Sequence, residues 1–142
     1  MTKNIPAALS DWQTNVVSQM ALNDPSKLAE YALHISRIVA YSNLVIQDEL
    51  VKIDEIGKKI AKSMKSSSEF RPTQFIEKIN HQMYKIENFK GNRDDYYNPS
   101  NSLLNTVIKR KTGNPITLSI LYIQLANSLK FKLYPVNFPS HF

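Results

Sequence analysis

The stretch that decides the fold is NFKGNRDDYYNPSNSLLNTVIKRKTGNPITLSILYIQLANSLKFKLYPVNFPSHF, residues 88–142. Two of the three glycines of the chain, Gly91 and Gly113, lie in it, and so does the most apolar segment, residues 115–129. A helix that is apolar on nearly every side is typical of the middle of a fold. We therefore expect the rest of the chain to pack around a core helix at residues 115–129.

Turn and cap residues mark where this helix begins. A shorter helix is expected at residues 102–111, capped by Ser100 or Asn101. Gly113 is expected to stop that shorter helix. Asn114 then suits the cap of the core helix, and Pro115 suits its first helical position.

The loop before these helices carries several candidate functional residues. Gly91 is expected to adopt a left-handed or otherwise strained backbone conformation. Residues 89–92, which end with Asn92, are expected to leave the preceding helix. The segment from Arg93 to Pro99 is expected to be ordered, because Tyr96 and Tyr97 give it apolar area to bury.

Two pairs of polar residues in this region have alternative interpretations. Asp94 and Asp95 fit a carboxylate pair for acid–base work or a cation site, and equally a solvated turn that pairs with Arg93. Asn101 and Asn105 fit a polar-ligand site, or side chains that hold the preceding loop through hydrogen bonds to its backbone.

After the core helix, residues 132–138 alternate in the manner of a strand, with Pro135 suggesting an edge or a bulge. A strand needs a partner, and the sequence contains no second convincing strand. The fold class expected is therefore mainly α, as a truncated α+β domain with one C-terminal strand. The exposed edge of that strand makes self-association an open alternative, and the sequence leaves open whether the chain is a fragment.

The N-terminal part reads as a flexible lead, residues 1–10, followed by a helical region, residues 11–87. Helical spacing predicts helices at residues 11–22, 26–41 and 44–64, and Pro72 opens another. Gly57 falls on the apolar stripe of its helix, which predicts close approach of a neighbouring helix. Residues 88–142 complete the single domain expected from a chain of 142 residues.

Composition excludes several classes of function. The chain has no cysteine, so disulfides, thiolate metal sites and a cysteine nucleophile are absent. His34 and His81 lack acidic or cysteine companions, so no metal and no cofactor are expected. No apolar run approaches the ~20 residues of a membrane span, and the N-terminus lacks the pattern of a signal peptide. We therefore expect a cytoplasmic protein.

The net charge is +6, and the basic excess is uneven. After Tyr96 the chain has no acidic residue, and its basic residues there are Lys109, Arg110, Lys111, Lys130 and Lys132. Such a face attracts nucleic acid or an acidic partner, or is a solvated lysine-rich surface.

The order F-x-G-N-x-x-x-Y-Y-x-P-x-N-S-x-L-N-x-V-I-x-R-x-T-G-x-P-I-T-L-S-x-L-Y, ending in F-P-x-H-F, resembles the SirB-type branch of the transglutaminase-like superfamily. The resemblance covers residues 88–142 and implies a cysteine-protease-like α+β core. In active members a cysteine begins the core helix, a histidine lies on the first strand after it, and an aspartate lies on the next strand. His141 matches the histidine, whereas Pro115 or Ile116 stands in the place of the cysteine.

The chain departs from the family pattern in other places. The aspartate-bearing strand would follow residue 142, so the expected domain is truncated after the histidine motif. Lys130, Pro135 and Ser140 stand where the family usually has glycine.

Three functions follow from these observations. The first is a non-catalytic, transglutaminase-like regulatory or protein-interaction domain, a pseudoenzyme whose partner is a protein. The second is an acyl-transfer or amide-hydrolysing enzyme with Thr117 or Ser119 as nucleophile and His141 as base. The third is nucleic-acid binding through the basic C-terminal half.

Overall fold

The computed structural model describes residues 9–10, 12–16, 24–64 and 71–136, and the remaining residues are outside this description. The elements in chain order are η1 (Trp12–Val16), η2 (Pro25–Lys27), α3 (Leu28–Val39), α4 (Ile46–Met64), α5 (Pro72–Asn80), η3 (His81–Ile86), β1 (Lys90–Gly91), η4 (Pro99–Ser102), α6 (Leu104–Arg110), β2 (Thr112–Gly113) and α7 (Pro115–Ser128). The described part of the chain is therefore mainly helical, as predicted, and it contains one small sheet.

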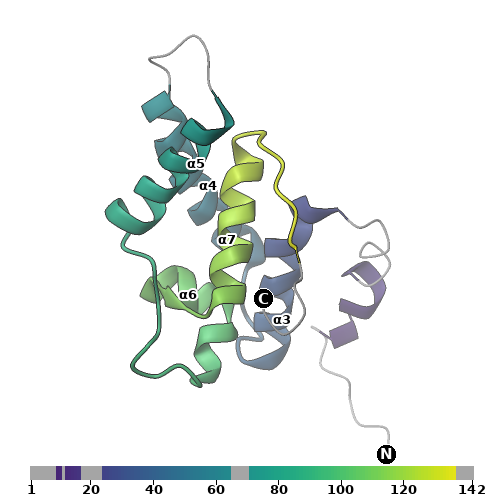
Figure 1. Ribbon diagram of the computed structural model, residues 1–142. Helices are drawn as coiled ribbons and strands as arrows, with labels where there is room; N and C mark the ends of the chain where they lie inside the picture. Colours follow the sequence, from purple (N-terminus) through teal and green to yellow (C-terminus); the bar gives the residue numbers. More distant parts are fainter. Residues whose placement is uncertain (1–8, 11, 17–23, 65–70, 137–142) are drawn as a thin grey trace, which may run out of the picture.

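Helix α7 lies at the centre of the fold, and it contacts α3, α4, α5 and α6 (Figure 1). Leu121, Leu125 and Ala126 on α7 are fully buried, and they meet apolar residues from each of these helices. The predicted core helix is confirmed, and its end lies one residue earlier than the predicted Leu129.

Helices α3 to α6 follow the predicted order, with one difference in packing. Of the helix predicted at residues 11–22, residue 11 and residues 17–22 lie outside the described residues. Helix α3 buries Ala29, Leu33 and Ser36, whereas Ile35 is 46% exposed and Val39 is 68% exposed. In the sequence, Leu28, Ala32, Ile35 and Val39 follow helical spacing and predict the buried face of this helix. That prediction was wrong at Ile35 and Val39. The face that is buried is the one against α4, α6 and α7.

Close contact between α4 and α7 confirms the prediction made for Gly57. A Cβ atom added to Gly57 would overlap the side chain of Ser128, near the end of α7. Ile53, Ile60 and Met64 lie buried on the same side of α4. The missing side chain at Gly57 therefore lets the two helix backbones approach each other.

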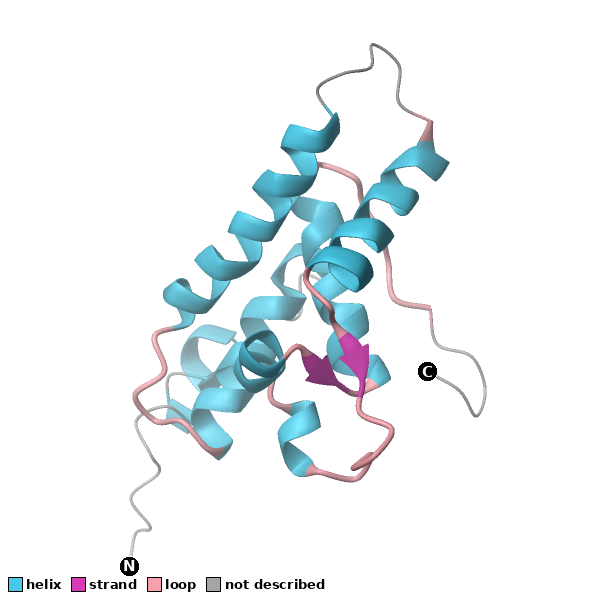
Figure 2. Cartoon of the chain, turned by 90° about the vertical axis from the view of Figure 1, so that its left-hand side faces the viewer, coloured by secondary structure: helices cyan, strands magenta, loops and turns pink. Residues whose placement is uncertain are grey.

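The sheet consists of β1 and β2, which pair in parallel with Lys90 opposite Thr112 and Gly91 opposite Gly113 (Figure 2). The amide of Lys90 donates to the carbonyl of Lys111 at 2.9 Å, and the amide of Asn92 donates to that of Gly113 at 3.0 Å. The short ladder brings together the two ends of the segment that contains η4 and α6.

The strand predicted at residues 132–138 is absent in its described part, residues 132–136. Strand pairing requires a neighbouring strand, and among the described residues β1 and β2 pair only with each other. Pro135 also lacks the amide proton that a ladder would use. The alternation of residue types alone was therefore misleading here.

Left-handed backbone conformations occur at Asn88, Lys111 and Lys130, with φ values of 58°, 59° and 60°. Neither Gly91 nor Gly113 has positive φ, so the left-handed conformation predicted for Gly91 was wrong. Lys111, rather than Gly113, terminates α6.

Gly113 is instead required by space. A Cβ atom there would lie 2.8 Å from Thr117 Oγ1 and 2.8 Å from Val107 Cγ1.

An ion-pair group joins η3 to two other helical segments. Glu87 follows η3 and accepts hydrogen bonds from Lys59 Nζ at 2.7 Å and from Lys111 Nζ at 3.0 Å. The ammonium of Lys111 also lies 4.3 Å from the ring centroid of the buried Phe89. One of the five basic residues of the C-terminal half is thus committed to contacts inside the fold.

Candidate functional site

The N-terminus of α7 is built by a reciprocal cap. Asn114 Oδ1 accepts the amide proton of Thr117 at 2.9 Å, and Thr117 Oγ1 accepts that of Asn114 at 3.2 Å. Pro115 occupies the first helical position, where a missing amide proton costs nothing. The predicted start of the core helix is confirmed.

Thr117 itself is 2% exposed. Its hydroxyl lies 2.8 Å from the carbonyl oxygen of Asn101, which is the shortest of its acceptor contacts. A hydroxyl that is buried and donates its proton to a backbone carbonyl is a cap and packing group. In this geometry it is closed to a substrate.

Asn101 holds the loop that precedes α6, which is the second of the two roles considered for it. Its Nδ2 donates to the carbonyls of Asp95, at 2.8 Å, and Tyr96, at 3.0 Å. Its Oδ1 accepts from Asn92 Nδ2 at 3.0 Å. Asn101 is 2% exposed, so its side chain is shielded from water at the centre of this network.

The expected cap of α6 by Ser100 or Asn101 is not formed. Leu103 is the N-cap residue of α6, and no side chain of its own closes the helix. Instead, Ser36 of α3 supplies an oxygen that accepts the amide proton of Leu104 at 3.1 Å. Asn98 caps the preceding turn η4, in which Pro99 is the first residue.

Asn105 does not join the network of Asn101. Its Oδ1 is buried and has no hydrogen-bond partner among the described residues. The two asparagines therefore do not form a common polar-ligand site.

Tyr96 and Tyr97 are exposed, at 56% and 91%, contrary to the burial expected of them. Order in this loop comes from asparagine side chains that bind its backbone. Asn92 Oδ1 accepts from the amide of Asp95 at 3.1 Å, in addition to the contacts of Asn101.

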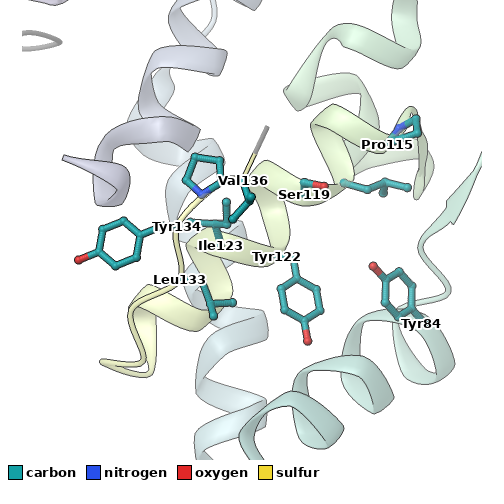
Figure 3. A pocket seen from close by; sticks show the side chains of 10 residues that line it. Tyr84, Pro115, Ser119, Tyr122, Ile123, Leu133, Tyr134 and Val136 are labelled. Carbon is teal, nitrogen blue, oxygen red and sulfur yellow. The ribbon is translucent and has the colours of Figure 1, made fainter. Parts of the chain in front are cut away.

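An open cavity of about 670 Å³, which we call the α7 groove, lies beside the core helix (Figure 3). Helix α7 supplies one wall, η3 a second, and the segment after α7 a third. Its lining residues are Tyr84, Pro115, Leu118, Ser119, Tyr122, Ile123, Leu133, Tyr134, Pro135 and Val136.

The α7 groove is neutral. None of its lining residues carries a charge. The rings of Tyr84 and Tyr122 stack with centroids 6.5 Å apart, and Tyr122 Oη donates to the carbonyl of Ile76 at 3.4 Å. Burial raises the pKa of both phenols, and the proximity of Tyr84 adds to the increase at Tyr122. The groove therefore suits an uncharged, apolar group.

The structure separates the candidate nucleophiles. Thr117 is buried under the loop, whereas Ser119 is exposed and lines the α7 groove. Pro115 and Ile116, which stand in the place that the resemblance gives to the cysteine, are both exposed at the start of α7. His141 lies outside the described residues.

The groove was missed from the sequence, although one pattern could have revealed it. Pro115, Leu118, Ser119 and Tyr122 follow the spacing of one helix face. That face of α7 is the one left open, so the helix is covered on most of its surface rather than on all of it.

The described residues contain no group of three or more histidine, cysteine, aspartate or glutamate side chains that could hold a metal ion. Within the same part of the chain, no helix combines the length and the apolar character that crossing a membrane requires.

A sequence profile of the transglutaminase-like superfamily matches residues 47–142. The chain is 49% identical over 70 residues to mouse F-box only protein 21, which is 49% of this chain and 11% of that protein. It is 34% identical over 119 residues to human F-box only protein 21, which is 71% of this chain and 19% of that protein. A UPF0162 protein of Xylella fastidiosa is 42% identical over 64 residues, 45% of this chain and 23% of the relative.

These matches cover between 11% and 23% of the length of the three relatives. No solved structure matches the chain. The profile nevertheless spans more than half of the residues, including the loop network and α7. The chain belongs to the transglutaminase-like superfamily.

Proposed function

We propose that this chain is a non-catalytic regulatory or protein-interaction domain of the SirB-type branch, that it acts in the cytoplasm, and that its partner is a protein. The proposal rests on one observation. At the start of α7, where active relatives are expected to carry a cysteine, the side chains are those of Pro115 and Ile116. The first hydroxyl of the helix, on Thr117, is buried and closes the cap.

The α7 groove supports an interaction role. It presents an apolar, uncharged surface on an element that is otherwise packed against four helices. Surfaces of this kind bind apolar groups of partners rather than polar substrates. Among its described lining residues Ser119 supplies the only aliphatic hydroxyl, and burial raises the pKa of the phenols of Tyr84 and Tyr122.

A second candidate function is favoured by Ser119 alone. Its hydroxyl is exposed in the groove, so it is accessible to a substrate in a way that Thr117 is not. In this case the chain transfers acyl groups or hydrolyses amides with Ser119 as nucleophile and His141 as base.

One assay separates the two functions. The purified chain is treated with a fluorophosphonate probe, which labels activated serines, and is then supplied with a fluorescent amine and an acyl donor. We expect no labelling and no amine incorporation. Labelling that Ser119→Ala and His141→Ala each abolish, with turnover of the acyl donor, would overturn the non-catalytic assignment.

The interaction role is tested with the same chain as bait. Ser119→Arg places a bulky charge in the groove at an exposed position, and Ser42→Arg places the same charge on an exposed turn outside it. We expect the first variant to lose a captured protein that the second retains. Capture that both variants retain equally would place the interaction elsewhere. Binding to nucleic acid is recognised separately, because it weakens steeply as salt rises.

A further inference from the structure

Residues 92–98, which we call the tyrosine loop, are fixed from the inside. The carbonyls of Asp95 and Tyr96 both accept from the buried side chain of Asn101. The amide of Asp95 is bound by Asn92, and the amide of Asn98 donates to the carbonyl of Asp95 at 3.3 Å. Both ends of the loop are anchored as well, one by β1 and the other by η4. A loop held in this way presents its outward side chains in a defined arrangement.

The outward side chains include an aromatic pair. The rings of Tyr96 and Tyr97 meet edge to face, with centroids 5.3 Å apart and planes at 89°. Tyr97 is 91% exposed, so it contributes almost no burial to the fold. Aromatic rings on a rigid loop bind with little loss of conformational entropy, because each has only two side-chain torsions to fix. The pair therefore forms a right-angled aromatic corner that is ready for a ligand.

The charge around the corner favours a positive ligand. The carboxylate of Asp95 already accepts a hydrogen bond, from Asn98 Nδ2 to Asp95 Oδ2 at 2.7 Å. Asp94 is exposed and makes no hydrogen bond or ion pair with another described residue. With Arg93, the loop carries a net charge of −1, in a chain whose net charge is +6. The segment that carries the aromatic corner is thus acidic by one charge, in a basic protein.

We infer that the tyrosine loop is a binding site for an alkylated ammonium group, held against the exposed rings of Tyr96 and Tyr97 with Asp94 as its counter-ion. The negative face of an aromatic ring attracts a cation, and the ring of Tyr97, which is 91% exposed, is accessible to one. An alkylated ammonium keeps its positive charge while its methyl groups lose little hydration, so it suits an exposed aromatic site better than a metal ion. This site is separate from the α7 groove, and the proposed function does not depend on it.

The test compares choline with its neutral isostere, in which a tert-butyl group replaces the trimethylammonium group. Binding is followed through the ring proton resonances of Tyr96 and Tyr97 at constant ionic strength. We expect saturable shifts with choline. The affinity for the neutral compound is expected to be lower than that for choline by a factor of roughly five or more. Tyr97→Ala is expected to remove binding, because this exposed ring supplies one wall of the corner. Asp94→Asn is expected to weaken binding severalfold, and Arg93→Ala to strengthen it.

Tyr134→Ala serves as the matched control, since Tyr134 is 63% exposed and lies outside the loop. It is expected to leave the affinity unchanged. Acetylated, amidated trimethyllysine is titrated in parallel. Tighter binding than choline assigns the ligand to a protein side chain, and weaker binding assigns it to a free small molecule. Equal affinity for choline and its neutral isostere, or the absence of saturable shifts at the two tyrosines, would overturn the proposal.

Discussion

The hydroxyl of Thr117 donates a hydrogen bond of 2.8 Å to the backbone carbonyl of Asn101. This contact links the first turn of α7 to the residue that holds the tyrosine loop, so the loop and the core helix form one unit. Sixteen positions separate the two residues in sequence. A network that is buried and fully paired is costly to break at any one member.

Thr117→Val keeps the shape of the side chain and removes its hydroxyl. We expect the free energy of unfolding to fall by about 1–3 kcal/mol, because buried partners of that hydroxyl lose their hydrogen bonds. Urea denaturation measures the change. Thr117→Ser retains the hydroxyl and should recover most of the loss. Equal stability of the valine and serine variants would show that the hydroxyl contributes nothing.

Gly113 and Gly91 form a matched pair, because both lie in the small sheet and neither has positive φ. A Cβ atom at Gly113 would press on Val107 and Thr117, whereas one at Gly91 would meet nothing within 4 Å. We therefore expect Gly113→Ala to cost about 1–3 kcal/mol and Gly91→Ala to change stability by about 0.5 kcal/mol or less. Thermal unfolding of the two variants tests this, and similar melting temperatures would contradict it.

Lys130 lies in the turn that follows α7, and its φ is 60°. Such a conformation is unfavourable for residues with a Cβ atom, and glycine adopts it freely. We expect Lys130→Gly to stabilise the fold by up to about 1 kcal/mol, and Lys130→Val to destabilise it. Lys132→Gly is the control, since Lys132 is exposed and has no positive φ. A loss of stability in Lys130→Gly larger than in the control would refute the prediction.

Glu87 should make stability depend on pH. Burial raises the pKa of its carboxyl group, but hydrogen bonds from Lys59 and Lys111 outweigh burial and hold the pKa below its ordinary value. Because the pKa is lower in the folded state, the stabilisation is complete above the unfolded-state pKa and is lost as pH falls through the folded-state pKa.

Glu87→Gln removes the ion pairs of Glu87 with Lys59 and Lys111. We expect the free energy of unfolding to fall by about 1 kcal/mol at neutral pH. The effect is small because the two lysines are partly solvated. At an acidic pH below the folded-state pKa the difference between the variant and the wild type should shrink, since the wild-type carboxyl is then protonated. Denaturation at both pH values measures it. A difference that is the same at both would exclude Glu87 as the titrating group.

Local signals predicted the parts of the fold that depend on neighbouring residues. Asn114 and Pro115 mark the start of α7, and Pro72 marks that of α5, because caps and first-turn prolines act within a few positions. Gly57 was also interpreted correctly, since a glycine on an apolar stripe has few roles other than close packing.

Features that depend on distant residues were not predictable in this way. The strand expected at residues 132–138 depended on a partner that the pattern cannot supply, and α3 turned a different face inward because three helices surround it. Left-handed conformations occur at Asn88, Lys111 and Lys130, which are not glycines, so residue type did not indicate them. The direction of Tyr97 depends on hydrogen bonds from Asn101, and the sequence shows that these residues are close but not which side faces water.

The central position of α7 has a consequence for how the protein is made. The helices α3 to α6 emerge from the ribosome before α7, which contacts each of them, has been translated. Synthesis at roughly 5–20 residues per second leaves the apolar face of α3 without its central partner for a time on the order of ten seconds. Folding of the whole domain is therefore expected to begin only when α7 has left the exit tunnel, and chaperones that bind apolar segments have that interval in which to act.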